Sequence, residues 1–320
     1  MGCHIHCFKF FSLIIVLVFS GILSACTQLF FFPMKEHVSS PGYFKLPYED
    51  HFISVANNTQ LHGWFLPAQT PKPKGTVLFL HGNAENISTH IAAVYWLPAA
   101  GYQVFLYDYR GYGKSTGNVD LIDSIADVHQ VIAYLLEKPE IKGHPFFILS
   151  QSLGSAIAVN AIQAKRYQGK VHGFIIDSGF SSFRKIAREK LALSRLLWLF
   201  QWPLSLTITG QHNPADLIAG VSPIPVLVIH GSKDNIIPFS HGLDIYAAAA
   251  APKAFMLVKD GDHIQFSLHA SLRRCLVEFL EKASSAANPP SATAPRVALS
   301  PRRLFPTPLY LLHPWSRTSM

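Results

Sequence analysis

Cysteine is scarce in this chain. The four cysteines stand at positions 3, 7, 26 and 275, and no two of them have C-x-x-C spacing. Thiols at that spacing build zinc ribbons and thioredoxin-like redox sites, so both classes are excluded. No spacing of histidine with aspartate or glutamate indicates a metal site either. The sequence therefore predicts an activity that needs neither a metal nor a cofactor.

Charge is also sparse. Charged residues make up 14% of the 320 positions against 49% hydrophobic ones, so one large α/β domain or two small ones can bury a sizeable core. A net charge of +8 is compatible with a nucleic-acid partner. Half of this excess comes from four arginines near the C-terminus, at positions 296, 302, 303 and 317. Since no zinc-finger, RNP-like or basic-helix pattern is present, no nucleic-acid partner is expected.

No charged residue lies between Phe10 and Phe32. An apolar run of this length is typical of an uncleaved signal anchor or of a cleaved signal peptide. The sequence L-S-A-C at positions 23–26 resembles the lipobox of bacterial lipoproteins. This resemblance implies that residues 1–25 are a signal peptide and that Cys26 carries a lipid. We expect a membrane-anchored protein that faces away from the cytosol, and the lipobox places it in the bacterial cell envelope, facing the periplasm.

Changes in composition divide the rest of the chain. Prolines and glycines interrupt residues 26–47, which are predicted to be a tether without regular structure. Residues 48–282 alternate strand and helix patterns, which indicates one α/β domain. A low-complexity segment, A-S-S-A-A-N-P-P-S-A-T-A-P, begins at residue 283, so residues 283–320 are expected to be disordered.

The α/β pattern predicts eight strands. The first two, residues 51–55 and 61–66, are expected to form an antiparallel hairpin with a turn at Asn57-Asn58. The other six are apolar runs whose helical connections imply a mostly parallel sheet, covered by helices on both faces and joined by right-handed crossovers. They are expected at residues 76–80, 103–107, 146–149, 173–176, 225–229 and 254–258.

The interval 178–222 is too long for a simple connection between two strands. A basic stretch, R-K-I-A-R-E-K, precedes a strongly apolar one that contains Trp198, Phe200 and Trp202. One interpretation is a helix packed on the sheet. The other is a small cap-like insertion over the active site, which lines an acyl pocket or touches lipid.

The chemistry centres on residues 145–154, with the sequence P-F-F-I-L-S-Q-S-L-G. An apolar strand here passes directly into the helix-compatible segment A-I-A-V-N-A-I. A tight turn at such a junction exposes its middle residue, Ser152, with the amides of a helix N-terminus behind it. The pattern G-x-S-x-G fits, except that Ser150 replaces the first glycine. The alternative is an ordinary strand-to-helix junction that is capped by a serine.

A nucleophilic serine needs a base, and the base needs an acid that fixes its tautomer. His263 follows the last predicted strand, in D-G-D-H, and Asp234 follows the strand before it, in H-G-S-K-D. Ligands bind at the carboxyl ends of strands in open α/β sheets, so these side chains and Ser152 are expected to meet there. Asp177 also ends a strand and is the alternative acid.

Over residues 45–282 the chain resembles the α/β-hydrolase superfamily. The matching motifs are H-G-N-A at 81–84, D-Y-R-G-Y-G-K-S-T-G at 108–117, the elbow at Ser152, G-S-K-D ending at Asp234 and G-D-H ending at His263. Within the superfamily it is most similar to membrane-associated hydrolase-domain proteins, which include protein depalmitoylases, and to serine-aminopeptidase-like hydrolases. The resemblance implies the α/β-hydrolase fold, with a mostly parallel eight-stranded sheet, helices on both faces and a small helical cap insertion.

The resemblance also implies roles for single residues. The nucleophile, the base and the acid that orients it are expected to be Ser152, His263 and Asp234. The oxyanion contacts are expected from the backbone N–H of Leu153 and from that of Asn83 or Ala84.

Other positions in these loops have assigned roles or depart from the family pattern. Glu85 stands where such relatives commonly have glycine, and a carboxylate there is expected to affect which acyl groups are accepted. Asp108 and Arg110 are interpreted as residues that structure their loop, and His81 as one that shapes the oxyanion loop.

Together these features predict a membrane-tethered serine hydrolase of the carboxylesterase or thioesterase type. It would cleave small esters or thioesters of hydrophobic acyl groups through an acyl-enzyme on Ser152. One alternative is peptide hydrolysis of the serine-aminopeptidase kind, which needs an acidic group to hold a free amino terminus, and Glu85 is the one hint of it. The other is a non-catalytic, membrane-tethered binding protein on the same fold. The presence of all three triad residues argues against it.

Overall fold

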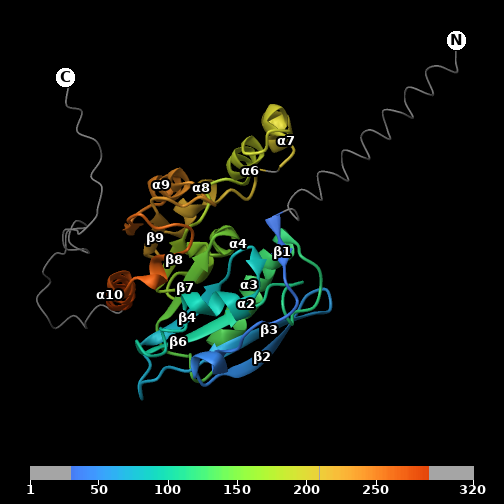
Figure 1. The fold of residues 1–320 in the computed structure, drawn as a ribbon. Coiled ribbons are helices and arrows are strands. Elements are labelled where there is room, and N and C mark those ends of the chain that lie inside the picture. Colours follow the sequence, from blue (N-terminus) through green and yellow to red (C-terminus); the bar gives the residue numbers. More distant parts are fainter. Residues whose placement is uncertain (1–29, 209, 288–320) are drawn as a thin grey trace, which may run out of the picture.

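A computed structural model describes residues 30–208 and 210–287 (Figure 1). Its centre is a sheet of eight strands, β2 (Glu49–Val55), β3 (Thr59–Leu66), β4 (Gly75–Leu80), β6 (Tyr102–Tyr107), β7 (Phe146–Gln151), β8 (Gly173–Asp177), β9 (Val226–Gly231) and β10 (Lys253–Val258). Their spatial order is β10-β9-β8-β7-β4-β6-β3-β2. The eight strands predicted from the sequence are confirmed, and their ends differ by two residues or fewer.

The sheet is mixed, and its parallel part carries the site. Strands β4, β6, β7, β8, β9 and β10 pair in parallel. Strand β3 pairs antiparallel with both β2 and β6. The turn of the β2–β3 hairpin contains Asn57 and Asn58, which have φ angles of 60° and 51°. Asparagine adopts this left-handed region more readily than most residues, so the predicted turn has a physical reason.

Helices bury both faces of the sheet. Successive strand side chains point to opposite faces, so Phe146 and Ile148 of β7 join one core cluster while Phe147 and Leu149 join the other. The first cluster is closed by α3 (Leu121–Leu136), α4 (Leu153–Ala161) and α9 (Phe239–Ala248), and the second by α2 (Ile87–His90) and α10 (Ala270–Ala287). Each such buried side chain contributes about 1.5–3 kcal/mol to folding.

Short elements complete the described chain. They are β1 (Phe32–Pro33), β5 (Ala84–Glu85), α5 (Ala164–Tyr167), α8 (Pro214–Leu217) and the 3-10 turns η2 (Pro41–Phe44), η3 (Ile91–Ala93), η5 (Ile218–Val221) and η6 (Phe266–Leu268).

The segment from residue 30 to residue 47 differs from the expected free tether. It contains little regular structure, as predicted, but it lies against the domain. Strand β1 pairs in parallel with β5. The amide of Asn86 donates to the carbonyl oxygens of Met34 and Glu36, at 3.0 and 2.7 Å. The backbone polar groups of this segment therefore find partners on the loop after β4, which holds the segment in place.

The C-terminal helix extends further than the sequence predicts. Helix α10 runs to Ala287, so the disorder predicted from residue 283 is wrong for its first five residues, which continue the helix. Ser284 Oγ donates to the Leu280 carbonyl there, as a helical residue does. The predicted signal peptide, Cys26 and residues 288–320 lie outside the described residues. Among the helices of the described part, none is long and apolar enough to cross a bilayer.

The 178–222 interval forms a helical insertion. Helix α6 (Phe183–Ala192), the 3-10 turn η4 (Trp198–Phe200) and α7 (Gln201–Leu206) project from the rest of the molecule above β1 (Figure 1). We call residues 183–206 the cap. Only the base of the cap, with Phe183 and Ile186, joins the core of the domain. Of the two interpretations of this interval, the structure therefore matches a projecting cap better than a helix laid on the sheet.

Candidate active site

Ser152 occupies a strained turn between β7 and α4. Its φ and ψ are 50° and −119°. L-residues rarely adopt this conformation, and it persists only where the surrounding structure enforces it. Its N–H donates to the Asp177 carbonyl oxygen at 3.0 Å, which ties the turn to the end of the neighbouring strand. The side chain lies at the boundary of a cavity, although the residue is only 5% exposed. This is the strand-turn-helix placement expected for a nucleophile elbow.

The two positions beside the elbow explain why one glycine is needed and the other is not. A Cβ on Gly154 would lie 2.5 Å from the Leu80 carbonyl oxygen, so α4 and β4 approach too closely for any side chain there. Ser150, in contrast, has room for its side chain. Its hydroxyl donates to the Ile175 carbonyl of β8 at 3.0 Å and lies 3.2 Å from Ser155 Oγ. The departure from the family pattern is therefore structurally satisfied.

His263 and Asp234 form a hydrogen-bonded pair. His263 Nδ1 donates to Asp234 Oδ2 at 2.8 Å, and the N–H groups of Ile236 and Ile237 donate to Oδ1 of the same carboxylate at 2.9 and 2.7 Å. Burial raises the pKa of Asp234, but the bonds from His263 and Ile237 outweigh it and hold the pKa below its usual range. The carboxylate is thus ionised at neutral pH and fixes His263 with its proton on Nδ1.

The loop that carries His263 is fastened to the strand ends around Ser152. Asp262 Oδ1 accepts the N–H groups of Asn235 and His263, which joins the two predicted triad loops. Ile264 N–H donates to Ser178 Oγ at 3.1 Å, next to the residue whose carbonyl holds Ser152. In the described part of the chain no hydrogen bond joins Ser152 to His263, and such contacts often tighten only when substrate is bound.

Asp177, the alternative acid, is bonded elsewhere. Its Oδ2 accepts from Gln151 Nε2 at 2.7 Å, and the side chain is fully buried. Burial raises the pKa of Asp177 to about 7, against which the Gln151 bond and the charge of His263 act only partly. A carboxyl that is half protonated near neutrality is a weak orienter of an imidazole, so the geometry and the charge both favour Asp234.

Two residues expected to supply oxyanion contacts, Leu153 and Asn83, line the cavity together with Ser152. Leu153 is the first residue of α4, so its N–H has no acceptor within the helix. Asn83 lines the same cavity as Ser152 and Leu153, whereas Ala84 lies in β5 and pairs with β1. The Asn83 carbonyl oxygen accepts from Phe32 N–H at 2.9 Å and from Tyr112 Oη at 2.6 Å, which holds the peptide that follows Asn83 in place. Of the two candidates for a second oxyanion donor, Asn83 is the better placed.

His81 stabilises the loop after β4 that contains Asn83. The ring is fully buried, its Nδ1 donates to the Gly82 carbonyl at 2.7 Å, and Tyr109 Oη donates to the His81 carbonyl at 2.9 Å. Burial lowers the pKa of His81 to about 3, so the ring is neutral. These contacts agree with the shaping role predicted for His81.

The cavity at Ser152 has a volume of about 660 Å³ and an apolar lining. The catalytic end is formed by Ser152, Leu153 and Asn83. The sides come from the cap, the N-terminal segment and the Asp234 loop, through residues such as Ile186, Leu197, Leu204, Phe30, Phe32 and Ile236. Among the described residues that line it, Lys190 alone carries a charge. A pocket of this size and character fits a hydrophobic group bound next to the serine.

Sequence reasoning missed several residues at the site. His90 approaches the oxyanion loop, since a Cβ on Gly82 would lie 3.1 Å from His90 Cε1 and 3.7 Å from Ser152 Cβ. Phe30 and Phe32 line the cavity although they lie in the run that was expected to be a signal or a tether. A histidine inside a short helix carries no local signal. The phenylalanines were hidden by the apolar character of the whole N-terminal run.

Asp108 and Arg110 have the structural roles that the sequence predicts. Arg110 pairs with both carboxylate oxygens of Asp127 at 2.7 Å. Asp108 is fully buried and accepts from Ile87 N–H at 3.0 Å and from His37 Nε2 at 2.7 Å. Burial raises the pKa of Asp108, but these bonds dominate and hold it well below its usual range.

One group in the described residues brings potential metal ligands together. Ligand atoms of His37, His62 and Asp108 all lie within 4.8 Å of one another. The 2.7 Å between His37 and Asp108 is a hydrogen-bond length, shorter than the roughly 3.3 Å between ligands of a tetrahedral zinc site. His62 Nε2 is also engaged by Asp50 at 2.6 Å. The group is therefore a hydrogen-bonded network that joins the N-terminal segment to the sheet.

Comparisons with known proteins agree with this architecture. A family model described as "Serine aminopeptidase, S33" matches residues 71–218. The "Uncharacterized protein YfhR" of Salmonella typhi is 34% identical over 248 residues, 73% of this chain and 82% of that protein. The "Alpha/beta hydrolase domain-containing protein WAV2" of Arabidopsis thaliana is 29% identical over 226 residues, 68% of this chain and 71% of that protein.

Solved structures show the same fold. The esterase Pf2001 of Pyrococcus furiosus superimposes with a TM-score of 0.62 over 79% of this chain and 97% of that chain, at 19% identity. The fold predicted from the sequence is thus confirmed. With a relative of 34% identity across most of both chains, and with a hydrolase fold, the chain belongs to the α/β-hydrolase superfamily.

Proposed function

We propose that this protein is a serine hydrolase that cleaves carboxylic esters or thioesters of hydrophobic acyl groups. The observation that carries the proposal is the hydrogen-bonded pair of His263 and Asp234, on loops bonded to the strand end that holds a strained Ser152 at the border of an apolar cavity. Membership of a hydrolase superfamily supports hydrolysis as the class of reaction. The acyl-group preference rests on the cavity alone.

The reaction would run through an acyl-enzyme. Ser152 Oγ attacks the carbonyl carbon while its proton passes to His263 Nε2, and the ionised Asp234 stabilises the imidazolium that forms. The N–H groups of Leu153 and Asn83 receive the developing oxyanion. Collapse of the intermediate expels the alkoxide or thiolate, which takes the proton from His263. A water molecule, deprotonated by His263, then releases the acid and restores Ser152.

The cavity supports a hydrophobic acyl group. Its walls are mostly aliphatic and aromatic, and Lys190, which carries the one charge among the described lining residues, lies on the cap. An acyl chain placed there leaves water without burying any polar group of its own, which favours binding. The volume of about 660 Å³ falls within the usual range of small-molecule sites, about 300–1,000 Å³.

Peptide hydrolysis is the second candidate, because the matching family model is described as a serine aminopeptidase. Recognition of a free amino terminus requires an acidic group at the site. Among the described lining residues there is none, and Glu85 lies outside the lining, in β5. The positive charge of Lys190 would repel an ammonium group. A panel of p-nitrophenyl esters of increasing chain length, set against aminoacyl-nitroanilides, separates the two activities.

The membrane tether is part of the same proposal. The sequence features that indicate it, the apolar run 10–32 and the lipobox ending at Cys26, lie almost wholly outside the described residues. Mass spectrometry of the mature N-terminus tests it. A chain that begins at a diacylated Cys26 supports the bacterial lipoprotein, and a chain that begins at Met1 overturns it in favour of an uncleaved anchor or of no processing.

The catalytic proposal is tested by labelling with a fluorophosphonate, which reacts with activated serines. We expect the full chain to be labelled and Ser152→Ala to remain unlabelled, with Ser150→Ala as the matched control that keeps its label. Equal labelling of Ser152→Ala and the wild type would remove Ser152 as the nucleophile. Absence of label on the folded wild type would favour a non-catalytic binding protein on this fold.

A further inference from the structure

The cap carries an unusual concentration of exposed apolar side chains. In the described part of the chain, nine of the eighteen exposed large hydrophobic residues fall within residues 193–206. The most exposed are Leu196, Leu193 and Leu199, at 80%, 77% and 72%. Exposed apolar patches that are contiguous and large mark surfaces that meet a partner or a membrane. We call the exposed apolar side chains of residues 193–206 the cap patch.

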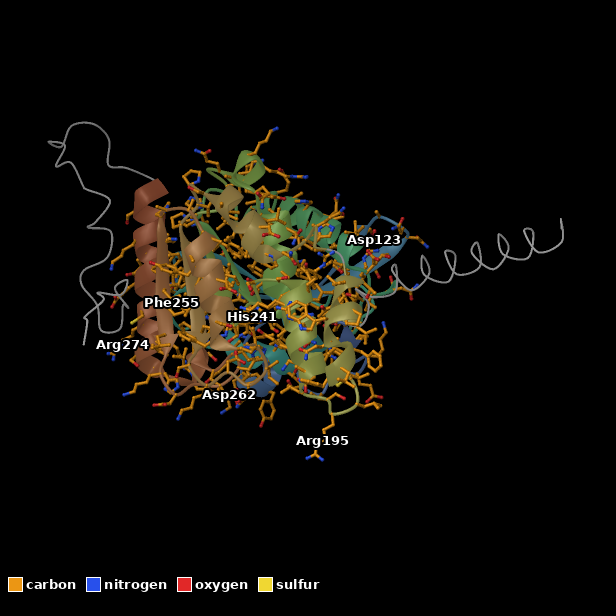
Figure 2. All side chains as sticks on the ribbon, turned by 90° about the horizontal axis from the view of Figure 1, so that it is seen from above. Asp123, Arg195, His241, Phe255, Asp262 and Arg274 are labelled. Carbon is orange, nitrogen blue, oxygen red and sulfur yellow. The ribbon has the colours of Figure 1, made fainter. Side chains whose placement is uncertain are left out.

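The cap is basic overall, although one of its basic residues, Lys185, is paired with Asp244 outside the cap at 2.6 Å. The cap contains five basic residues, at positions 184, 185, 188, 190 and 195, and one acidic residue, Glu189, which pairs with His241 at 2.8 Å. Arg195 extends from the far end of the cap, away from the body of the molecule (Figure 2). In the described part of the chain it meets no carboxylate. Arg188 lies over the ring of Trp202, 4.1 Å from its centroid, and so brings charge to the edge of the patch.

The N-terminal end of the described chain meets the base of the cap. The ring of Phe30 packs edge-on against that of Phe183, the first residue of α6, with 5.2 Å between centroids. It also lies 6.3 Å from the ring of Phe180. A tether that leads from Phe30 to a bilayer would therefore leave the domain beside the cap, which places the cap patch within reach of the same surface.

Exposed residues of both the cap and the N-terminal segment line the cavity. Leu197 and Leu204 of the cap and Phe32 of the N-terminal segment all line it, and all three are at least 36% exposed. Phe32 is 61% exposed, so the lining of the cavity includes an apolar side chain in contact with solvent. An acyl chain that left a bilayer at this place would enter the cavity without crossing water.

We propose that the cap patch docks on an anionic lipid bilayer and delivers acyl substrates from that bilayer to the cavity. Tryptophan, leucine and flanking basic residues on one short helical unit are the combination that binds membrane interfaces, through apolar burial and attraction to anionic headgroups. The proposal rests on the hydrolase function of Ser152 for the delivery step. The docking step stands independently of it.

Docking is tested with the full chain reconstituted into vesicles whose phosphatidylcholine carries brominated acyl chains, which quench nearby tryptophans. The wild type contains Trp198 and Trp202 in the cap patch, and Trp198→Phe with Trp202→Phe removes both while three tryptophans remain. We expect strong quenching in the wild type, more when phosphatidylglycerol is included, and loss of most of it in the double variant. Equal fractional quenching of both proteins would overturn docking. Quenching that does not respond to phosphatidylglycerol would overturn the preference for an anionic surface.

Delivery is tested with Leu196→Glu and Leu199→Glu combined, since neither side chain lines the cavity. The matched control combines Ile122→Glu and Leu268→Glu, two exposed apolar residues outside the cap, 55% and 69% exposed. We expect kcat/KM on a long-chain ester dissolved in vesicles to fall about tenfold in the cap variant and to stay within about twofold in the control. Hydrolysis of a short water-soluble ester should be unchanged in both.

These outcomes separate the two proposals. If neither ester is hydrolysed by the folded wild type, the hydrolase function fails, while quenching still decides docking. If the soluble ester is hydrolysed and the cap variant matches its control on vesicles, delivery is wrong and Ser152 keeps its role. Chemical crosslinking in detergent reports self-association. A crosslinked dimer that the cap variant loses, with no tryptophan quenching in vesicles, would assign the cap patch to a second copy of the chain instead.

Discussion

His263 Nδ1 lies 2.8 Å from Oδ2 of Asp234, and this is the carboxylate that the histidine contacts. The neighbouring acid, Asp177, turns its side chain to Gln151 instead. The two carboxyl groups also differ in charge, because hydrogen bonds lower the pKa of Asp234 while burial raises that of Asp177. One fold thus holds an ionised acid and a partly protonated acid close to the same imidazole.

Exchange of each acid for its amide should rank the two. We expect Asp234→Asn to lower kcat/KM on a soluble ester by about 10²–10⁴-fold, because the amide no longer stabilises the imidazolium or selects its tautomer. Asp177→Asn replaces a carboxyl that is already half protonated at neutral pH and should change kcat/KM less than about tenfold. Each variant serves as the control for the other, and the opposite ranking would reassign the acid to Asp177.

The raised pKa of Asp177 predicts a dependence of stability on pH. The folded chain keeps its proton up to about pH 7, whereas the unfolded chain loses it near 3.8. The stabilisation that this proton provides is therefore complete below pH 4 and is lost as pH rises to 7. Asn cannot titrate, so Asp177→Asn should gain stability relative to the wild type between pH 4 and 7, by about 4 kcal/mol at most.

Urea unfolding of both proteins at several pH values measures this gap. All other titrating groups are the same in the two proteins. The difference between their unfolding free energies at pH 4 is therefore an internal reference. If the difference in unfolding free energy between Asp177→Asn and the wild type stays constant from pH 4 to pH 8, the raised pKa of Asp177 is contradicted.

Ser150 should be tolerant of the glycine that the family pattern prefers. Ser150→Gly removes the hydroxyl that donates to the Ile175 carbonyl and frees the backbone, so we expect a loss of about 1–2 kcal/mol of unfolding free energy. The turn at Ser152 is held by other contacts, and kcat should stay within about threefold. Ser150→Ala isolates the loss of the hydroxyl. A large fall in kcat with unchanged stability would mean that Ser150 acts on the reaction itself.

Tyr112 should support catalysis through the oxyanion loop. Its hydroxyl donates to the Asn83 carbonyl at 2.6 Å and accepts from Phe32 N–H at 3.2 Å. Tyr112→Phe should loosen the Asn83–Ala84 peptide and so the loop that holds the Asn83 N–H. We expect kcat to fall about three- to tenfold with little change in KM, because the Asn83 N–H would contact the oxyanion that develops only during the reaction. Tyr102→Phe is the control, since in the described structure its buried hydroxyl has no partner. Equal effects of both variants would argue against a specific role for Tyr112.

The sequence by itself determined the sheet and the order of the chemical groups. Apolar runs bounded by turn residues mark the six strands of the parallel part, because a strand covered on both faces is largely apolar. The turn at Asn57-Asn58 marks the antiparallel hairpin. The junction at Ser152 and the positions of Asp234 and His263 after strands followed from topology, since parallel strands bring their carboxyl ends to one edge. These features are local or periodic, so a linear pattern carries them.

Only the tertiary structure decided contacts between segments that are distant in sequence. Asp177 and Asp234 both end strands, and their partners, Gln151 and His263, became known only once the loops were packed. The choice between Asn83 and Ala84 as the second oxyanion donor depended on the pairing of β1 with β5, which composition could not reveal. In the same way the apolar stretch of the cap is equally compatible with burial and with exposure. The difference depends on which surfaces the fold leaves uncovered, and that is a property of three-dimensional packing.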